Sequence, residues 1–368
     1  MASALKNLID KKFVVSLARN IRNVDPKFKD KEFSTDVLTS DWSALELKQR
    51  VRKISSTLNR FLPGDYPHQV ATLKKVIREF DGGLGSLLFP DFVEIHSESH
   101  IENHEESHWD TSIEALKYFT PFISSEFAIR PFIKKDPKKM LAIMQKWSKD
   151  SDHHVRRLSS EGFRPRLPWS FRLDEFIKNP KQVIAILENL KNDESLYVRK
   201  SVANHLNDIT KDHPELVLEL AKKWIGKSEN TDWILKHGLR TLLKRGDQRA
   251  LKIFGLTKTD KAKVGSVKMS QQKNRIGSQI EFTFRLKNES PGQVLRLEYA
   301  IHYLKKNDSH NKKVFKIAEK SFSSGEHVIT KKHSLRQMTT RKHHPGDHKL
   351  DVIVNGETKA STKFVVIK

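Results

Sequence analysis

The chain has 368 residues and carries 68 Lys and Arg against 45 Asp and Glu, a formal net charge of +23. This cationic excess favours a polyanionic partner, most simply DNA or RNA. The absence of cysteine excludes disulfides, thiolate metal sites and cysteine nucleophiles. Because no apolar run is long enough to form a signal peptide or to span a bilayer, we expect a cytoplasmic protein without a membrane partner.

Helical periodicity marks the chain up to about residue 260. One apolar stripe steps by four, three, four and four residues and stops at a Pro-Gly pair; it comprises Leu47, Val51, Ile54, Leu58 and Leu62, followed by Pro63-Gly64. Shorter stripes follow within 183–190 and 216–224. We therefore predict a mostly helical domain over residues 1–261.

A histidine-rich segment spans residues 96–108. Within it, His104-Glu105-Glu106-Ser107-His108 matches the H-E-x-x-H pattern of zinc proteases, in which two histidines one helical turn apart bind the metal. A zinc-protease helix is packed in a core, whereas Ile101 is the only apolar residue of this segment. A solvated polar segment is therefore the favoured interpretation, and a metalloprotease ranks third among the possible functions.

A predicted helix from Trp109 through Phe119 leads to the first candidate residue. Glu126 and Arg130 follow it with the spacing of an i,i+4 surface ion pair. Apolar neighbours such as Phe127 also allow part of the Glu126 carboxylate to face a groove beside the next helical repeat. At this point a surface pair and a groove-facing carboxylate both remain open.

The run 153–169 is the most informative part of the sequence. A helix at its start is expected to end with Gly162 at the C′ position, because a proline follows three residues later. Arg164, Arg166 and Trp169 then lie on stiff, exposed backbone. Guanidinium groups suit phosphates, and a flat ring suits a base or a cation. The alternative is a solvated basic loop whose Trp belongs to a core.

A faint repeat links this helix to those that follow. Val155-Arg156-Arg157 recurs as Val198-Arg199-Lys200 about 43 residues later, and a weaker echo begins at Trp233. A period near 40 residues with two helices per unit is typical of HEAT-like solenoids, an α-α superhelix. We expect the second helices to line a concave face, where Arg156, Arg157, Arg199 and Lys200 contact DNA. Chance similarity between amphipathic helices is the alternative.

Beyond about residue 262 the apolar period changes to two. Apolar and polar residues alternate within 280–286, 295–303 and 350–354, and turn residues such as Asn355-Gly356 separate the runs. We predict an all-β immunoglobulin-like sandwich over residues 262–368, without a disulfide. This domain is the more basic one per residue, and its loop with Arg341 and Lys342 is expected to contact DNA.

Three blocks of the helical part resemble the bacterial alkylpurine DNA glycosylases of the HEAT-like repeat class, specifically the AlkC branch, which is related to AlkD. The blocks are 45–51, 125–132, and 154–157 continued by 164–169. The resemblance covers about residues 1–260, and part of the branch carries an immunoglobulin-like C-terminal domain. It implies a monofunctional DNA repair glycosylase that removes positively charged N-alkylated bases, such as 3-methyladenine and 3-methylcytosine.

The resemblance also implies roles for individual residues. Glu126 is expected to be the catalytic carboxylate, and Trp169 the ring beside the lesion. Arg157, Arg164 and Arg166 are expected to hold DNA phosphates.

The chemistry expected of such a site needs no metal or organic cofactor. A cationic base leaves readily, and the transition state resembles an oxocarbenium ion, as in glycoside hydrolysis. A carboxylate aimed at this cation stabilises it electrostatically. Asp208 is a second catalytic candidate, and Asp110 is a further carboxylate to consider.

The expected partner is double-stranded DNA containing alkylated bases, bound by a monomer. The alternative function is a non-catalytic HEAT-like nucleic-acid-binding scaffold, in which Glu126 forms only a surface ion pair.

Overall fold

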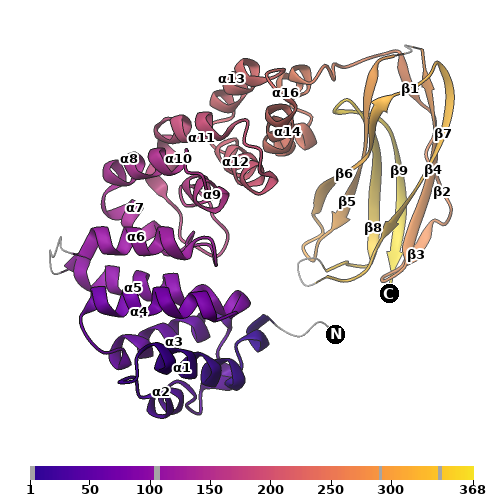
Figure 1. The fold of residues 1–368 in the computed structure, drawn as a ribbon. Coiled ribbons are helices and arrows are strands. Elements are labelled where there is room, and N and C mark those ends of the chain that lie inside the picture. Colours follow the sequence, from indigo (N-terminus) through magenta and orange to yellow (C-terminus); the bar gives the residue numbers. More distant parts are fainter. Residues whose placement is uncertain (1–4, 103–107, 290–291, 339–341) are drawn as a thin grey trace. The chain divides into compact units, whose positions relative to one another are not determined.

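The structure is a computed structural model of the chain that describes residues 5–102, 108–289, 292–338 and 342–368, with the backbone alone for 97–102. Helices make up the first part of the chain and strands the last part (Figure 1). The predicted fold class, a helical solenoid followed by an immunoglobulin-like sandwich, is confirmed. No described helix is long and apolar enough to cross a membrane.

The chain divides into two compact units. The first comprises residues 1–213 and 226–238, and the second comprises residues 214–225 and 239–368. The strands begin at Ala262, where the sequence predicts the change of period. The second unit nevertheless begins before its strands, because the helices ahead of them pack closely on the sandwich. A Cβ atom at Gly246 would lie 2.7 Å from the carbonyl oxygen of Gly356.

The first unit is a succession of helices joined by short loops. Its α-helices are α1 (Lys11–Val24), α2 (Asp30–Val37), α3 (Leu47–Phe61), α4 (Tyr66–Glu79), α5 (Leu88–Glu102), α6 (Trp109–Phe119), α7 (Arg130–Lys135), α8 (Pro137–Trp147), α9 (His153–Glu161), α10 (Asp174–Lys178), α11 (Ile184–Leu190), α12 (Leu196–Ile209) and α14 (Glu229–Gly238). Short 3-10 helices lie at Leu5–Leu8, Trp42–Ala44, Gly83–Leu87 and Pro180–Val183.

Helix α3 shows how local sequence sets these elements. Glu46 and Gln49 form a capping box at its start, which satisfies two backbone N–H groups that have no partner inside the helix. Its predicted stripe is buried along the whole length, and the helix ends just before the Pro-Gly pair, as predicted. Burial of this stripe against α5 and α2 joins the helix to its neighbours.

The predicted repeat corresponds to pairs of helices. Helices α8 and α9 form one pair, and α11 and α12 form the next. The second helices α9, α12 and α14 pack side by side, because α12 contacts both of the others. These second helices carry the residues singled out in the repeat.

The second unit combines three helices with the β-sandwich. The helices are α13 (Pro214–Trp224), α15 (Arg240–Arg245) and α16 (Gln248–Ile253). One sheet contains β1 (Ala262–Val264), β2 (Lys268–Met269), β4 (Gln279–Asn288) and β7 (Gly325–Ser334). The other has the order β3 (Lys273–Arg275), β9 (Glu357–Ile367), β8 (Gly346–Val354), β5 (Val294–Leu304) and β6 (His310–Ser321).

Alternating burial builds the core of the sandwich. Ile280, Phe282, Phe284 and Leu286 of β4 are buried, as the period-two pattern predicts, and they join the apolar residues of β5 and β8 in one cluster. The predicted Asn355-Gly356 turn joins β8 to β9. Both residues have positive φ, 48° and 79°, as a tight hairpin requires.

Candidate active site

Glu126 lies in the loop between α6 and α7. Ser125 anchors this loop: it is fully buried, its hydroxyl donates to the carbonyl of Leu116 (2.8 Å), and it accepts from the hydroxyl of Thr120 (2.9 Å). The loop is therefore bound to the last turn of α6, and Glu126 follows the anchor directly. The Glu126 side chain retains 17% of its exposure, so it lies at the edge of the core.

The partners of Glu126 differ from the one expected at i+4. Its Oε2 atom accepts a hydrogen bond from the Ser124 hydroxyl (2.9 Å) and forms an ion pair with Nη1 of Arg157 on α9. Arg130 is instead fully buried. The interpretation as a surface Glu126–Arg130 pair is therefore wrong, because α9 supplies the cation from the next repeat.

Arg130 holds the loop that follows α9. Its guanidinium donates to the carbonyl oxygens of Gly162 (2.8 Å), Arg164 (2.9 Å) and Phe171 (2.5 Å). Burial and the nearby Arg164 cation lower the pKa of Arg130 to about 10. The group still keeps its charge at neutral pH, so one buried cation fixes both ends of the loop.

Acidic and basic side chains alternate in a row that we call the ion-pair ladder, made of Glu126, Arg157, Glu161, Arg164 and Asp208. Arg157 lies 3.5 Å from Oε1 of Glu161, which also accepts from Nη1 of Arg164 (2.6 Å). Arg164 reaches Asp208 through Nε and Nη2, both 2.9 Å from Oδ2. The two predicted catalytic carboxylates thus end the same ladder.

The ladder charges stabilise one another against the cost of burial. Burial alone would lower the pKa of Arg157, but the charges of Glu161 and Glu126 outweigh it and raise that pKa. Glu161 and Asp208 have the same effect on Arg164, whose pKa is also raised. Both guanidinium groups are therefore firmly cationic beside the partly exposed Glu126 carboxylate.

Trp169 has the exposure that the sequence predicts and an unusual backbone. It keeps 63% of its exposure, and its φ is 65°, in the left-handed region that residues with a side chain rarely adopt. The prediction of exposed backbone is wrong for Arg164, which is buried in the ladder. Gly162 also differs from the prediction: its φ is −60°, and a Cβ atom there would lie 2.9 Å from Ile129. Close packing, not a left-handed turn, therefore accounts for the glycine.

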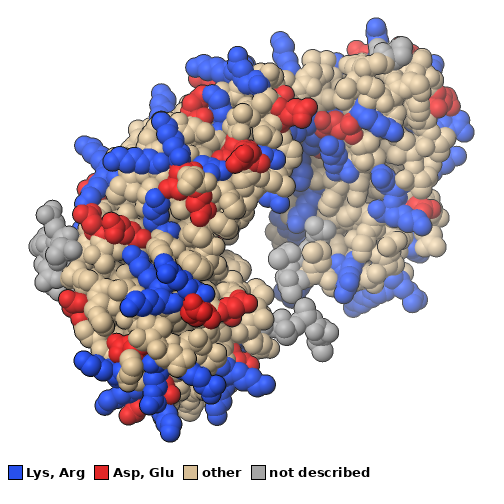
Figure 2. Space-filling model, viewed as in Figure 1, with Lys and Arg blue, Asp and Glu red and all other residues tan. Residues whose placement is uncertain are grey.

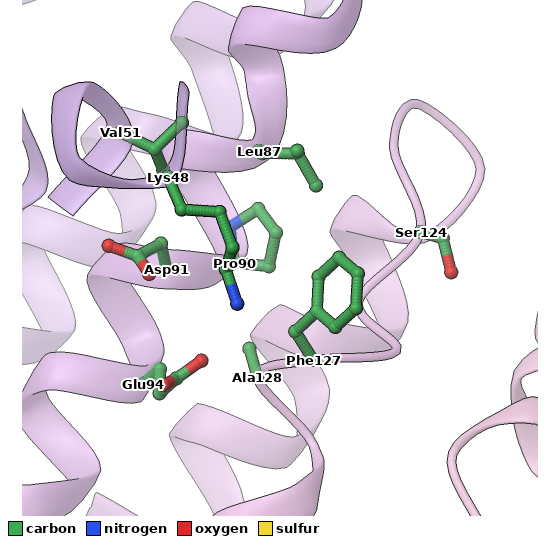
Figure 3. Close-up of a pocket in the computed structure, with 9 residues that line it drawn as sticks. All are labelled: Lys48, Val51, Leu87, Pro90, Asp91, Glu94, Ser124, Phe127 and Ala128. Carbon is green, nitrogen blue, oxygen red and sulfur yellow. The ribbon is translucent and has the colours of Figure 1, made fainter. Parts of the chain in front are cut away.

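A small pocket lies between the Glu126 loop and helices α3 and α5 (Figure 3). The residues that line it are Lys48, Val51, Leu87, Pro90, Asp91, Glu94, Ser124, Phe127 and Ala128. Arg52 is paired with Asp91 (3.0 Å) and Glu94 (2.7 Å). Burial raises the pKa of Asp91 to about 6, although the Arg52 charge opposes the shift.

The repeated arginines Arg156 and Arg199 occupy equivalent positions and share one role. Nη1 of Arg156 donates to the carbonyls of Asp150 (2.9 Å) and Ser151 (2.8 Å). Nη1 of Arg199 donates to the two equivalent carbonyls before α12 (2.8 and 2.7 Å). Each arginine therefore closes the loop ahead of its own helix, which accounts for its recurrence in the repeat.

The remaining cations predicted to bind DNA have different surroundings. Arg166 forms a two-pronged pair with Asp212, with Nη2 2.9 Å from both carboxylate oxygens. Lys200 and Lys342 are exposed, and Arg341 lies outside the described residues. Lys and Arg side chains are spread over the visible face of both units and outnumber Asp and Glu there (Figure 2).

Two members of the site were not recognised from the sequence. Glu161 is buried at the centre of the ladder, and its spacing from Arg157 and Arg164, i+4 and i+3, was the available signal. Tyr197 is the other: the Arg157 guanidinium lies 4.8 Å from its ring centroid. No sequence signal links Tyr197 to Arg157, because the two lie on different repeats.

The H-E-x-x-H motif lies mostly outside the described residues. His96 is buried and packs on aromatic rings, with its ring centroid 4.4 Å from that of Tyr66.

Within the described residues, the group that could hold a metal ion is Asp152, His153 and His154, whose potential ligand atoms lie within 4.8 Å of one another. Asp152 also caps α9, accepting from the backbone N–H of His154 (2.7 Å).

Comparisons with known proteins agree with this architecture. Residues 107–242 match the family model described as DNA alkylation repair enzyme, and residues 263–368 match that of "Uncharacterised protein YhaZ, C-terminal Ig-like domain". The chain is 41% identical to YhaZ of Bacillus subtilis over 363 residues, which cover 98% of this chain and 99% of YhaZ.

A solved structure decides the family. The alkylpurine DNA glycosylase AlkC of Pseudomonas fluorescens, bound to DNA containing an abasic site analog, is 40% identical, with a TM-score of 0.92 and coverage of 100% of both chains. The chain belongs to the AlkC family. The resemblance inferred from three sequence blocks is therefore confirmed, and it extends beyond the helical part to the sandwich. The roles of single residues in this AlkC-family chain remain predictions.

Proposed function

We propose that this protein is a DNA repair glycosylase that hydrolyses the N-glycosidic bond of positively charged N-alkylated bases, of the 3-methyladenine and 3-methylcytosine class, in double-stranded DNA. Membership of the AlkC family supports a glycosylase. The observation that carries the catalytic assignment is the Glu126 carboxylate, which is held at one oxygen by Ser124 and Arg157 at the edge of the core.

Glu126 is proposed to stabilise the transition state by its charge. The C1′–N bond breaks with its electron pair going to the cationic base, which leaves neutral, and positive charge develops on the sugar. Both donors to Glu126 bind Oε2, so within the described residues no hydrogen bond engages Oε1. That oxygen can face the oxocarbenium ion and accept a proton from the water that attacks C1′.

Trp169 is proposed to contact the lesion or its sugar. Its ring is exposed on a loop that Arg130 fixes by hydrogen bonds to the carbonyls of Arg164 and Phe171. An indole face attracts a cation by about 0.5–2 kcal/mol. The ring would therefore favour a positively charged base or sugar at the same place where Glu126 acts.

Their contacts within the protein give three arginines roles other than the phosphate binding expected from the sequence. Arg157 and Arg164 are engaged by carboxylates, so we propose that they set the position and charge of Glu126 and Asp208. Arg156 closes a loop and is paired with Asp193 (2.7 Å). Phosphate contacts are proposed for Lys200, which is exposed, and for Arg166, whose ion pair with Asp212 is more exposed than the pairs of the ladder.

The sandwich is proposed to be a second DNA contact and not a catalytic unit. Its cationic loops, with Lys342 and the adjacent Arg341, suit phosphates. We expect DNA affinity to fall steeply between about 50 and 200 mM salt, because each phosphate contact releases counterions. Equal affinity at both concentrations would contradict a mode of binding based on the DNA backbone.

The partner is proposed to be duplex DNA bound by a monomer in the cytoplasm, at the nucleoid. The decisive experiment incubates the protein with methylated duplex DNA, with and without EDTA, and measures released bases. Release that resists EDTA is the expected result. DNA binding without release would favour the non-catalytic scaffold. Release lost with EDTA would show that excision depends on a metal ion, for which Asp152, His153 and His154 are the candidate ligands within the described residues.

A further inference from the structure

Lys48 on α3 connects the two loops of the proposed site. Its ammonium donates to the backbone carbonyl of Trp169 (2.9 Å), across 121 residues of sequence. The same nitrogen lies 4.7 Å from the ring centroid of Phe127, the residue after Glu126. In Figure 3 the Lys48 side chain runs past Pro90 and ends beside Phe127. One exposed lysine therefore contacts both the Trp169 loop and the Glu126 loop.

The Trp169 backbone needs such a contact. Its left-handed conformation is unfavourable for a residue with a Cβ atom, and it persists only where the surroundings hold it. Arg130 fixes the loop at Arg164 and Phe171, on either side of the tip, and it does not reach Trp169. The Lys48 hydrogen bond is made at the strained residue itself.

Lys48 shares its pocket with two carboxylates that another cation engages. Asp91 and Glu94 line the same pocket as Lys48. Arg52 forms the ion pairs with both of these acids. The Lys48 ammonium donates instead to the Trp169 carbonyl.

We propose that Lys48 is a positioning residue for base excision, which holds Trp169 in its left-handed conformation and ties it to the loop of Glu126. This inference rests on the proposed glycosylase function. Under this proposal Lys48 affects the rate of the chemical step through Trp169, and this effect is separate from any contribution of Lys48 to DNA affinity.

The test measures single-turnover excision of an alkylated base at saturating enzyme, together with DNA affinity at several salt concentrations. Lys48→Met is expected to slow excision about tenfold, the size of losing one hydrogen bond from a charged donor. Its salt dependence should match that of the wild type. Lys48→Arg, which keeps a donor and the charge, should recover part of the rate. Lys53→Met on the same helix is the matched control, because Lys53 pairs with Asp41 and not with either loop.

A double-mutant cycle separates positioning from general destabilisation. If Lys48 acts through Trp169, Lys48→Met should add little further loss in a Trp169→Ala background. An equal tenfold loss in that background would overturn the proposal. A decrease of about 0.9 in the salt slope would also overturn it, because it would make Lys48 a phosphate ligand. If the wild-type protein itself releases no base, the proposed function fails, and that result is distinct from a Lys48 variant with the wild-type rate.

Discussion

Each unit of this protein buries a network of ion pairs, and the two networks differ in what surrounds them. In the sandwich, Arg296 on β5 pairs with Glu298 (2.6 Å) and with Glu319 on β6 (2.8 Å). These residues lie on two paired strands, and Arg296 and Glu298 are buried. In the helical unit, the ladder ends in an irregular loop at Glu126, which is partly exposed.

A buried charge is therefore not by itself a sign of catalysis. In both networks each buried charge has a partner of opposite sign, as burial requires. The ladder differs because its last carboxylate reaches the surface on the loop that Lys48 links to a strained, exposed Trp169. We therefore infer a functional role from the place where the network reaches the protein surface, and not from the presence of ion pairs.

Glu126→Gln should lower the single-turnover rate of excision about 10²–10³-fold, the usual cost of losing one preorganised electrostatic group. The substitution keeps the shape of the side chain and removes its charge. DNA affinity should stay the same or rise slightly, because binding depends on cations. A rate close to the wild-type value at saturating enzyme would show that another carboxylate acts, and Asp208 and Asp110 would be tested next.

Asp208→Asn tests the other end of the ladder. Asp208 is buried and pairs with Arg164 and with Lys211 (2.9 Å), so its loss should move Arg164 and, through Glu161, Arg157. We expect excision to slow about tenfold together with a lower melting temperature, since breaking a buried pair is destabilising. A rate loss without a change in melting temperature would indicate that Asp208 acts directly on the substrate.

His205 should make the helical unit sensitive to acid. Complete burial, with a further contribution from the Arg164 charge, lowers the pKa of His205 to about 3. Between pH 6.5 and 3 the unfolded chain binds a proton that the folded chain does not, so stability falls as pH falls through this window, by up to about 1.4 kcal/mol per pH unit.

The His205→Asn variant provides the control for this acid sensitivity. The asparagine amide can still donate to the carbonyl of Ser160, which lies 3.0 Å from Nδ1 of His205. Urea unfolding of wild type and variant at several pH values measures the difference. If the two proteins lose stability equally between pH 6.5 and 5, His205 is not the group responsible.

Arg296→Met should have the smallest effect on excision and a large effect on stability. It leaves Glu298 buried without its cation, which costs about 3–5 kcal/mol, so the sandwich should melt earlier. The double variant Arg296→Met/Glu298→Met removes both charges and should recover much of that loss. Single-turnover excision below the melting transition should remain near the wild-type rate. A loss comparable to that of Glu126→Gln would give the sandwich network a catalytic role.

The parts of the site that the sequence predicted are those set by local pattern. Trp169 follows a proline-rich turn that cannot remain helical, so its exposure was predictable. The burial of Arg164 could not be predicted in this way. Its partners are Glu161, at the end of α9, and Asp208, in the next repeat. The spacing also predicted the wrong partner for Glu126. Residues at i and i+4 form a pair only where both belong to one helix, and Glu126 lies in the loop before α7.

The sequence by itself determined the two periods, the helical repeat, the hairpin turn at Asn355-Gly356 and the cationic balance, because each depends on residues close together in the chain or on composition. The tertiary structure alone decided which arginine meets Glu126 and which lysine meets Trp169. These contacts join α9 to the loop after α6, and α3 to the loop after α9. Their geometry depends on how successive helices stack, and side-chain burial in that stack determines which charges pair with each other and which remain exposed for DNA.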